Sequence, residues 1–230
     1  MLGAQRPLSR PEHPDELLFI VVHQASELWF KLLLHEFGTL AARFEAGDAP
    51  GAILSLRRIN DVVRIVTDQL SALDTLPPKQ FNAFRGYLGT SSGSQSAQFR
   101  AIEVASGLRD ARFLALIAEN GILPPLVQQA LARPSLEAQF DALLAMHHVS
   151  LERVYGDPAL TTLLLLAEAL LEYEQGFGRW RFLHVQLVER IIGPDTGGTG
   201  GSQGAKDLHR TLGQRFFPKL WAVRAKFYAG

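Results

Sequence analysis

Residues 160–192 read LTTLLLLAEALLEYEQGFGRWRFLHVQLVERII, and this stretch decides the fold class. Its apolar side chains recur every three or four residues, which is the spacing of one buried face of an α-helix. Gly176 and Gly178 are the points in the run where we expect a break. The stretch therefore predicts one long helix, or two helices in succession, near the end of the chain.

The rest of the chain has the same helical character. Alternation of apolar and polar residues, the pattern of a strand, is nearly absent. We predict an all-α fold, a helical bundle that forms a single domain over residues 1–230. Residues 17–22 are apolar on all sides, so we expect burial all round. The expected helices are 15–46, 51–73, 80–85, a segment from 96, weaker segments within 108–146, 160–192, and an amphipathic stretch after 204.

Composition excludes several classes of protein. Lys plus Arg and Asp plus Glu both number 23 in 230 residues, so the formal net charge is zero. A neutral chain lacks the excess of basic residues that binds nucleic acid or an anionic membrane. There is no cysteine, which excludes disulfides and thiolate-bound metals. The N-terminus lacks the apolar core of a signal peptide, and the longest apolar run, 160–171, is short for a membrane span. We expect a cytoplasmic protein with no membrane or nucleic-acid partner.

His184 is the histidine of greatest interest. It lies on a stripe with Phe177, Trp180, Leu187 and Ile191, spaced as one helix face. A neutral imidazole on such an apolar face is what a haem iron needs as an axial ligand. The alternative is a hydrogen-bonded core histidine, and spacing alone favours that alternative.

Two further pairs join an aromatic ring to a polar side chain one helical turn away. Phe19 and His23 share a face, which suits the wall of an aromatic substrate pocket, although an ion pair of His23 with Glu27 is the structural alternative. Phe81 and Arg85 share a face in the same way. A guanidinium holds a carboxylate in a bidentate fork, and a surface ion pair is the commoner alternative.

The remaining motifs point less clearly to a function. The glycines of 197–202 permit close approach of a ligand to the backbone, although composition favours a surface loop. His35-Glu36 lacks the second histidine of a zinc-protease motif. The number of histidines and carboxylates in the sequence also permits an iron site made of two histidines and one carboxylate.

Four separated segments resemble the tryptophan 2,3-dioxygenase family. Their order and spacing match the family over nearly the whole chain. They are HPDELLFIVVHQ (13–24) with ELWFK (27–31) and HE (35–36); FNAFR (81–85) with YL (87–88) and SSGSQS (91–96); RWRFLHV (179–185) with VERIIG (188–193); and GTGGS (198–202) with RFFP (215–218) and LW (220–221).

The resemblance implies a role for each matched residue, with haem b as the cofactor in a buried pocket. It implies that His184 is the axial ligand of the haem iron and that His23, the candidate catalytic residue, lies near the indole N–H. It implies that Arg85 grips the substrate carboxylate and that Thr199 meets the ammonium group. The other implied contacts are Phe19, Ile20, Val21, Val22 and Phe81 with the substrate, and Ser92 and Gly93 with the haem.

The activity implied is cleavage of the C2–C3 bond of L-tryptophan with O2 to give N-formylkynurenine, a step of tryptophan degradation by the kynurenine pathway. The resemblance also implies a homotetramer, a dimer of dimers. Alternatives are a haem monooxygenase acting on a substituted tryptophan, a non-catalytic haem protein that binds O2, and a cofactor-free helical interaction module. Residues 2–9 resemble an internal stretch of the family, so we expect a short member with a more open active site.

Overall fold

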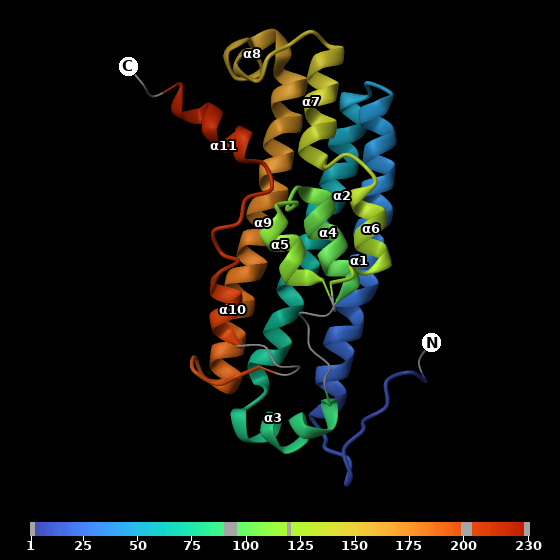
Figure 1. Ribbon diagram of the computed structural model, residues 1–230, viewed down its shortest axis with the longest axis vertical. Coiled ribbons are helices and arrows are strands. Elements are labelled where there is room, and N and C mark those ends of the chain that lie inside the picture. The colour runs from blue at the N-terminus through green and yellow to red at the C-terminus, as the bar shows by residue number, and fades with distance from the viewer. Residues whose placement is uncertain (1–2, 90–95, 119–120, 199–203, 228–230) are drawn as a thin grey trace. The chain divides into compact units, whose positions relative to one another are not determined.

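The computed structural model describes residues 3–89, 96–118, 121–198 and 204–227 (Figure 1). Within those residues the regular structure is helical and no strand occurs, which confirms the all-α prediction. In chain order the elements are α1 (Glu16–Glu45), α2 (Ala49–Asp68), η1 (Gln69–Thr75), α3 (Pro78–Arg85), η2 (Gly86–Leu88), α4 (Ala97–Ser106), α5 (Ala111–Ile117), α6 (Pro125–Leu131), α7 (Leu136–Met146), α8 (Leu151–Gly156), η4 (Pro158–Leu160), α9 (Thr161–Ile192), α10 (Ala205–His209) and α11 (Pro218–Ala225).

The chain divides into two compact units. Unit 1 comprises residues 1–29, 64–96 and 177–214, and unit 2 comprises 30–63, 97–176 and 215–230. Helices α1, α2 and α9 each contribute residues to both units. That the whole chain forms one domain stays a prediction.

Helix α9 runs without interruption through both glycines at which a break was expected. A Cβ atom on Gly176 would lie 2.9 Å from Cγ1 of Val63. The missing side chain therefore lets α9 approach α2 closely within unit 2. A glycine inside a helix costs about 1 kcal/mol relative to alanine, and this close packing is the physical reason for accepting that cost.

The predicted helix 51–73 is wrong at its end. Helix α2 stops at Asp68, and the chain continues as the 3-10 helix η1. Leu70 and Leu73 of η1 are buried, so the tighter winding still turns apolar side chains inward. The start of α3 fits its sequence, because Pro78 occupies the first helical position, where no backbone N–H is needed.

Helix α1 also differs from expectation. Val22 is buried, but Leu17 and Val21 are 44% and 45% exposed, so all-round burial of 17–22 is wrong. The reason is that unit 1 covers one side of this helix only. By length and composition alone, α1 is the one helix of the described residues that meets the criteria for crossing a membrane, a feature the sequence analysis did not single out. Core helices of soluble proteins meet the same criteria, so the finding by itself assigns no membrane.

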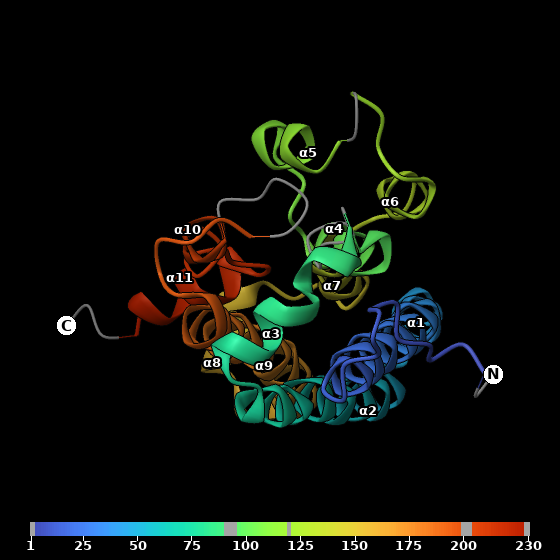
Figure 2. The ribbon, with the colours of Figure 1, turned by 90° about the horizontal axis from the view of Figure 1, so that it is seen from below.

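Unit 2 has a core of aliphatic and aromatic side chains around α9, and α4 packs beside α6 (Figures 1 and 2). Tyr173 of α9 is fully buried, its hydroxyl lies 2.6 Å from that of Ser106, and its ring stacks on Phe216. The fully buried aliphatic side chains include Leu33, Leu40, Leu56, Ile59, Leu166 and Leu170.

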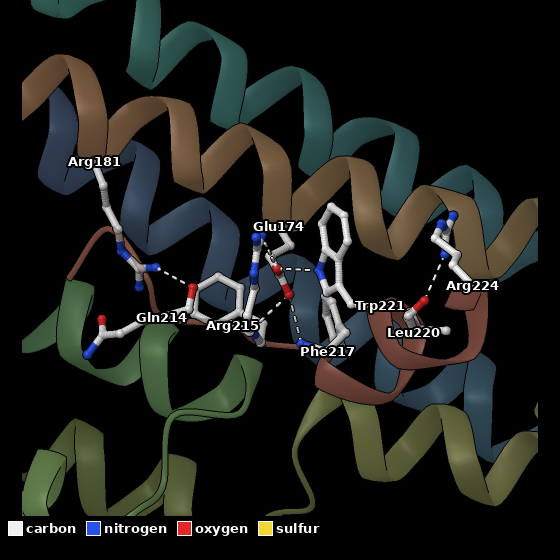
Figure 3. Close-up of polar contacts among 9 residues, drawn as sticks. Glu174, Arg181, Gln214, Arg215, Phe217, Leu220, Trp221 and Arg224 are labelled. Carbon is white, nitrogen blue, oxygen red and sulfur yellow. Dashed lines mark hydrogen bonds and ion pairs between the residues drawn. The ribbon is translucent and has the colours of Figure 1, made fainter. Parts of the chain in front are cut away.

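A buried carboxylate anchors the C-terminal segment in unit 2 (Figure 3). Glu174 accepts hydrogen bonds from the backbone N–H groups of Phe216 and Phe217, both at 2.8 Å, and from Nε1 of Trp221 at 2.6 Å. Arg215 adds an ion pair at 3.2 Å. Glu174 is 3% exposed, and a buried charge is tolerated only when several donors meet it in this way.

In unit 1, a second buried carboxylate fixes the segment that precedes α1. Glu16 accepts hydrogen bonds from the backbone N–H groups of Leu8 at 2.7 Å and Ser9 at 3.1 Å, and from the Ser9 hydroxyl. Helix α3 lies across the ends of the helical segments of this unit (Figure 2). Its aromatic side chains thereby reach α1, which builds the site described next.

Candidate functional site

The N-terminal part of α1 presents an aromatic ring and an imidazole side by side. The ring centroids of Phe19 and His23 are 4.0 Å apart. Nδ1 of His23 lies 2.8 Å from the carbonyl oxygen of Phe19. A carbonyl oxygen only accepts, so Nδ1 carries the proton in this contact and Nε2 of the neutral ring keeps a lone pair. His23 therefore offers an acceptor to a ligand.

The electrostatics of His23 agree with a neutral ring. His23 keeps exposed surface, but the protein atoms around the imidazole desolvate it, and this lowers its pKa below the ordinary value of 6.5. The hydrogen bond to the Phe19 carbonyl and the charge of Glu27 act in the opposite direction and are smaller effects. At pH values above 6.5 the imidazole ring of His23 is therefore uncharged.

Helix α3 supplies the opposite aromatic wall. Phe81 and Phe84 are buried, with ring centroids 5.5 Å apart in an edge-to-face arrangement. The ring of Phe19 lies 5.5 Å from Phe81 and 5.8 Å from Phe84. Three rings from two segments far apart in the sequence thus form one packed group.

Arg85 closes α3 beside this group. Its side chain is half-buried, and one terminal nitrogen donates a hydrogen bond to the carbonyl oxygen of Gly197 at 2.5 Å. The contact joins α3 to the glycine-rich segment that follows α9. Within the described residues Arg85 forms no ion pair with a carboxylate, so its charge is available to an anionic ligand.

The C-terminal half of α9 carries the predicted stripe. Phe177, Leu187 and Ile191 are buried, whereas Trp180 and His184 in the middle of the stripe are half-buried. The Trp180 and His184 rings lie 4.9 Å apart. The stripe is therefore a buried helix face that is partly accessible to solvent at His184. The histidine is neither fully buried in the core nor fully exposed on the surface.

One hydrophobic cluster joins these elements within unit 1. Its buried members on α1, α3 and α9 are Val22, Phe81, Phe84, Leu187 and Ile191, and Leu70, Leu73 and Leu76 join them from η1 and the residue that follows it. Phe19 and Trp180, the ring neighbours of the two histidines, pack against it. The cluster thus brings three of the four matched segments together, and Arg85 contacts Gly197, the residue directly before the fourth.

The remaining predicted residues are placed as follows. Ile20 is half-buried, and Val21 is exposed because successive residues of a helix point about 100° apart. Ser92, Gly93 and Thr199 lie outside the described residues. Of the described residues nearby, Gly204 (φ 65°) approaches the carbonyl oxygen of Thr196 so closely that a Cβ atom on it would lie 2.4 Å away.

Sequence reasoning missed two residues of this site. Phe84 is fully buried in the cluster and contacts Phe19. The ring of His13 lies beside Phe84 in a tilted arrangement, with ring centroids 5.3 Å apart. Phe84 follows Phe81 by three residues, so the helical spacing that identified the Phe81 and Arg85 pair was signal enough to find it.

The donor set suits a haem better than a metal ion held by protein alone. Among the described residues no group of three or more His, Asp or Glu side chains is placed to hold a metal. A haem iron needs a single protein nitrogen, and the half-buried His184 is a side chain that could offer one.

The fold and these residues define an all-α protein with a site of two accessible imidazoles, an aromatic wall and an arginine. A family model for tryptophan 2,3-dioxygenase matches residues 1–119 and 130–227. The chain belongs to the tryptophan 2,3-dioxygenase family, as the resemblance predicted.

Individual relatives agree with the family model. The tryptophan 2,3-dioxygenase of Kineococcus radiotolerans is 40% identical over 98% of this chain and 87% of its own length. That of an Anaeromyxobacter species is 40% identical over 97% of this chain and 91% of its own length. That of Serratia proteamaculans is 36% identical over 100% of this chain and 90% of its own length. The similarity therefore extends well beyond the four matched segments.

Proposed function

We propose that this chain is a haem-dependent dioxygenase that cleaves the C2–C3 bond of L-tryptophan with O2 and forms N-formylkynurenine. One observation carries the proposal: Phe19, Phe81 and Trp180, from three separate segments, pack on one cluster in a member of this family. This packing sets His23, Arg85 and His184 around the same cluster.

His184 is the residue that would hold the haem iron. It stands on the 32-residue helix α9, and the ring of Trp180 one turn earlier lies 4.9 Å from its own. When bound, the haem supplies the chemistry that activates O2. Ser92 and Gly93, from the second matched segment, are proposed to lie beside the cofactor.

His23 is proposed to orient the indole. Its neutral ring presents the Nε2 lone pair, because Nδ1 donates to the Phe19 carbonyl. An indole N–H is a donor only, so the two groups are complementary. This role needs an acceptor at a defined position and no transfer of a proton to His23.

Arg85 and the aromatic wall are proposed to hold the rest of the substrate. The guanidinium would exchange its bond to the Gly197 carbonyl for a stronger, charge-assisted pair with the substrate carboxylate. Phe19 and Phe81 offer ring faces and edges to the indole, and their packing keeps water from the reacting bond. Thr199, Ile20, Val21 and Val22 are proposed to complete the substrate contacts.

We also propose that the protein acts in the cytoplasm as a homotetramer. The apolar residues Leu17 and Leu28 on one face of α1 are 44% and 59% exposed, which leaves apolar surface for a neighbouring subunit. Light scattering at micromolar concentration tests the assembly, and a monomeric mass would refute it.

The deciding experiment is a single turnover of the purified protein with L-tryptophan and isotopically labelled O2. We expect a haem absorption spectrum and a product that carries two labelled oxygen atoms. One labelled atom would identify a monooxygenase. A reversible oxygen complex without loss of indole absorbance would identify a carrier or sensor, and a colourless protein that cannot be loaded with haem would exclude all three functions.

A further inference from the structure

A groove of about 640 Å³ lies in unit 1, between the end of α2 with η1 on one side and the last turns of α9 on the other. None of the residues proposed above to touch haem or substrate lines it. Its volume is within the range of about 300–1,000 Å³ that small-molecule sites occupy.

Three leucine side chains line part of the groove. Leu70 and Leu187 are 8% and 5% exposed and line the groove, and both belong to the cluster that supports the proposed active site. Leu183 adds a partly exposed apolar wall. The groove can therefore cover the aliphatic part of a ligand of modest size.

Two opposite charges face the groove from its two walls. Asp74 comes from η1 and Arg190 comes from the last turn of α9. Neither forms an ion pair or side-chain hydrogen bond with another residue of the described chain. Asp68, the other carboxylate in the groove, lies 3.6 Å from Arg64. This ion pair partly neutralises the charge of Asp68.

An unmatched carboxylate and an unmatched guanidinium on facing walls are complementary to a molecule that carries both charges. Gln186 and Ser71 add neutral hydrogen-bonding groups to the same groove. We propose that this groove is a binding site, separate from the proposed active site, for a small zwitterion with an aliphatic body, the chemical class of an aliphatic α-amino acid. Asp74 receives the ammonium group, Arg190 receives the carboxylate, and the leucines receive the side chain.

The test uses L-leucine as the probe and titration calorimetry on the purified full chain. We expect saturable binding with one site per chain. Asp74→Asn and Arg190→Gln should each weaken it about tenfold or more, which is the typical loss of one charge-assisted contact. Isoamylamine and isovalerate, which each carry one of the two charges, should bind at least tenfold more weakly than L-leucine.

Matched controls separate a local effect from a general one. Glu172→Gln and Arg57→Gln remove exposed charges from helices of unit 2, and we expect them to leave the affinity for L-leucine unchanged. Arg85→Ala removes the carboxylate partner of the proposed active site. L-leucine should bind this variant as tightly as the native chain.

Three results would overturn the proposal. They are no binding of L-leucine at millimolar concentration, binding that survives both Asp74→Asn and Arg190→Gln, and binding that is lost in Arg85→Ala. The last result would place L-leucine in the proposed active site instead. None of these results would refute tryptophan cleavage, so the two proposals fail independently.

Discussion

Nδ1 of His23 lies 2.8 Å from the carbonyl oxygen of Phe19, one helical turn earlier in α1, and the two rings lie 4.0 Å apart. This contact selects the tautomer of His23, because only a protonated Nδ1 can donate to a carbonyl. It therefore decides which nitrogen is left for a ligand.

The first prediction concerns the pH dependence of substrate binding. Desolvation lowers the pKa of His23 below 6.5, so the ring is neutral at pH 7 and gains a proton only as the pH falls below that value. Protonation converts Nε2 from an acceptor into a donor, which opposes the indole N–H. We expect L-tryptophan affinity to be constant above pH 7 and to fall on the acid side.

His23→Gln tests the assignment, because an amide oxygen also accepts but does not titrate in this range. The acid-side loss should disappear in that variant, measured by tryptophan titration from pH 5 to 8. His23→Ala should keep the haem and measurable turnover, with a cost of about 1 kcal/mol in binding. Complete loss of turnover with intact substrate binding would make His23 an essential catalytic group.

His184→Ala is expected to lose the haem or its histidine-ligated absorption spectrum. The reason is that a half-buried imidazole on α9 is the proposed axial ligand. Added imidazole should restore part of the spectrum by occupying the space left by the ring. His209→Ala, which removes an exposed histidine bound to Glu189, is the control. A native spectrum in His184→Ala would refute the assignment.

Arg85→Ala should weaken L-tryptophan binding by about 2 kcal/mol, roughly 30-fold, while haem content stays unchanged. Arg85→Lys should recover only part of this, because an ammonium lacks the planar fork of a guanidinium. Equilibrium titration of both variants with L-tryptophan decides the matter. Unchanged affinity in both would show that the bond to Gly197 is the whole role of Arg85.

Glu174→Ala should destabilise the fold strongly. The substitution leaves the backbone N–H groups of Phe216 and Phe217 and the indole nitrogen of Trp221 buried without their acceptor (Figure 3). We expect a loss of about 3–5 kcal/mol in the free energy of unfolding, measured by urea denaturation. Arg215→Ala, which removes the partly exposed partner only, should cost about 1 kcal/mol or less. An equal loss of unfolding free energy in both variants would contradict the claim that the three buried donors to Glu174, rather than the ion pair with Arg215, account for most of the stabilisation.

Much of the fold was predictable because helices are encoded locally. The spacing of apolar residues in 160–192 predicted α9, and the stretch 15–46 predicted α1 to within a residue of each end. Phe81 and Arg85 were found by the same rule. The uninterrupted course of α9 through Gly176 was not predictable, because it depends on the distance to Val63 on another helix.

The sequence by itself determined the helical class, the family and the identity of the residues proposed to bind haem and substrate. Those properties depend on residue types and on their order along the chain, so they can be identified from the sequence segment by segment. Only the tertiary structure decided that Phe19, Phe81 and Trp180 pack on one cluster, and that Leu17 and Val21 remain exposed. It alone showed that Asp74 and Arg190 face one groove. The physical reason is that burial and contact between distant segments depend on how helices pack together, and helical periodicity marks a face without identifying what covers it.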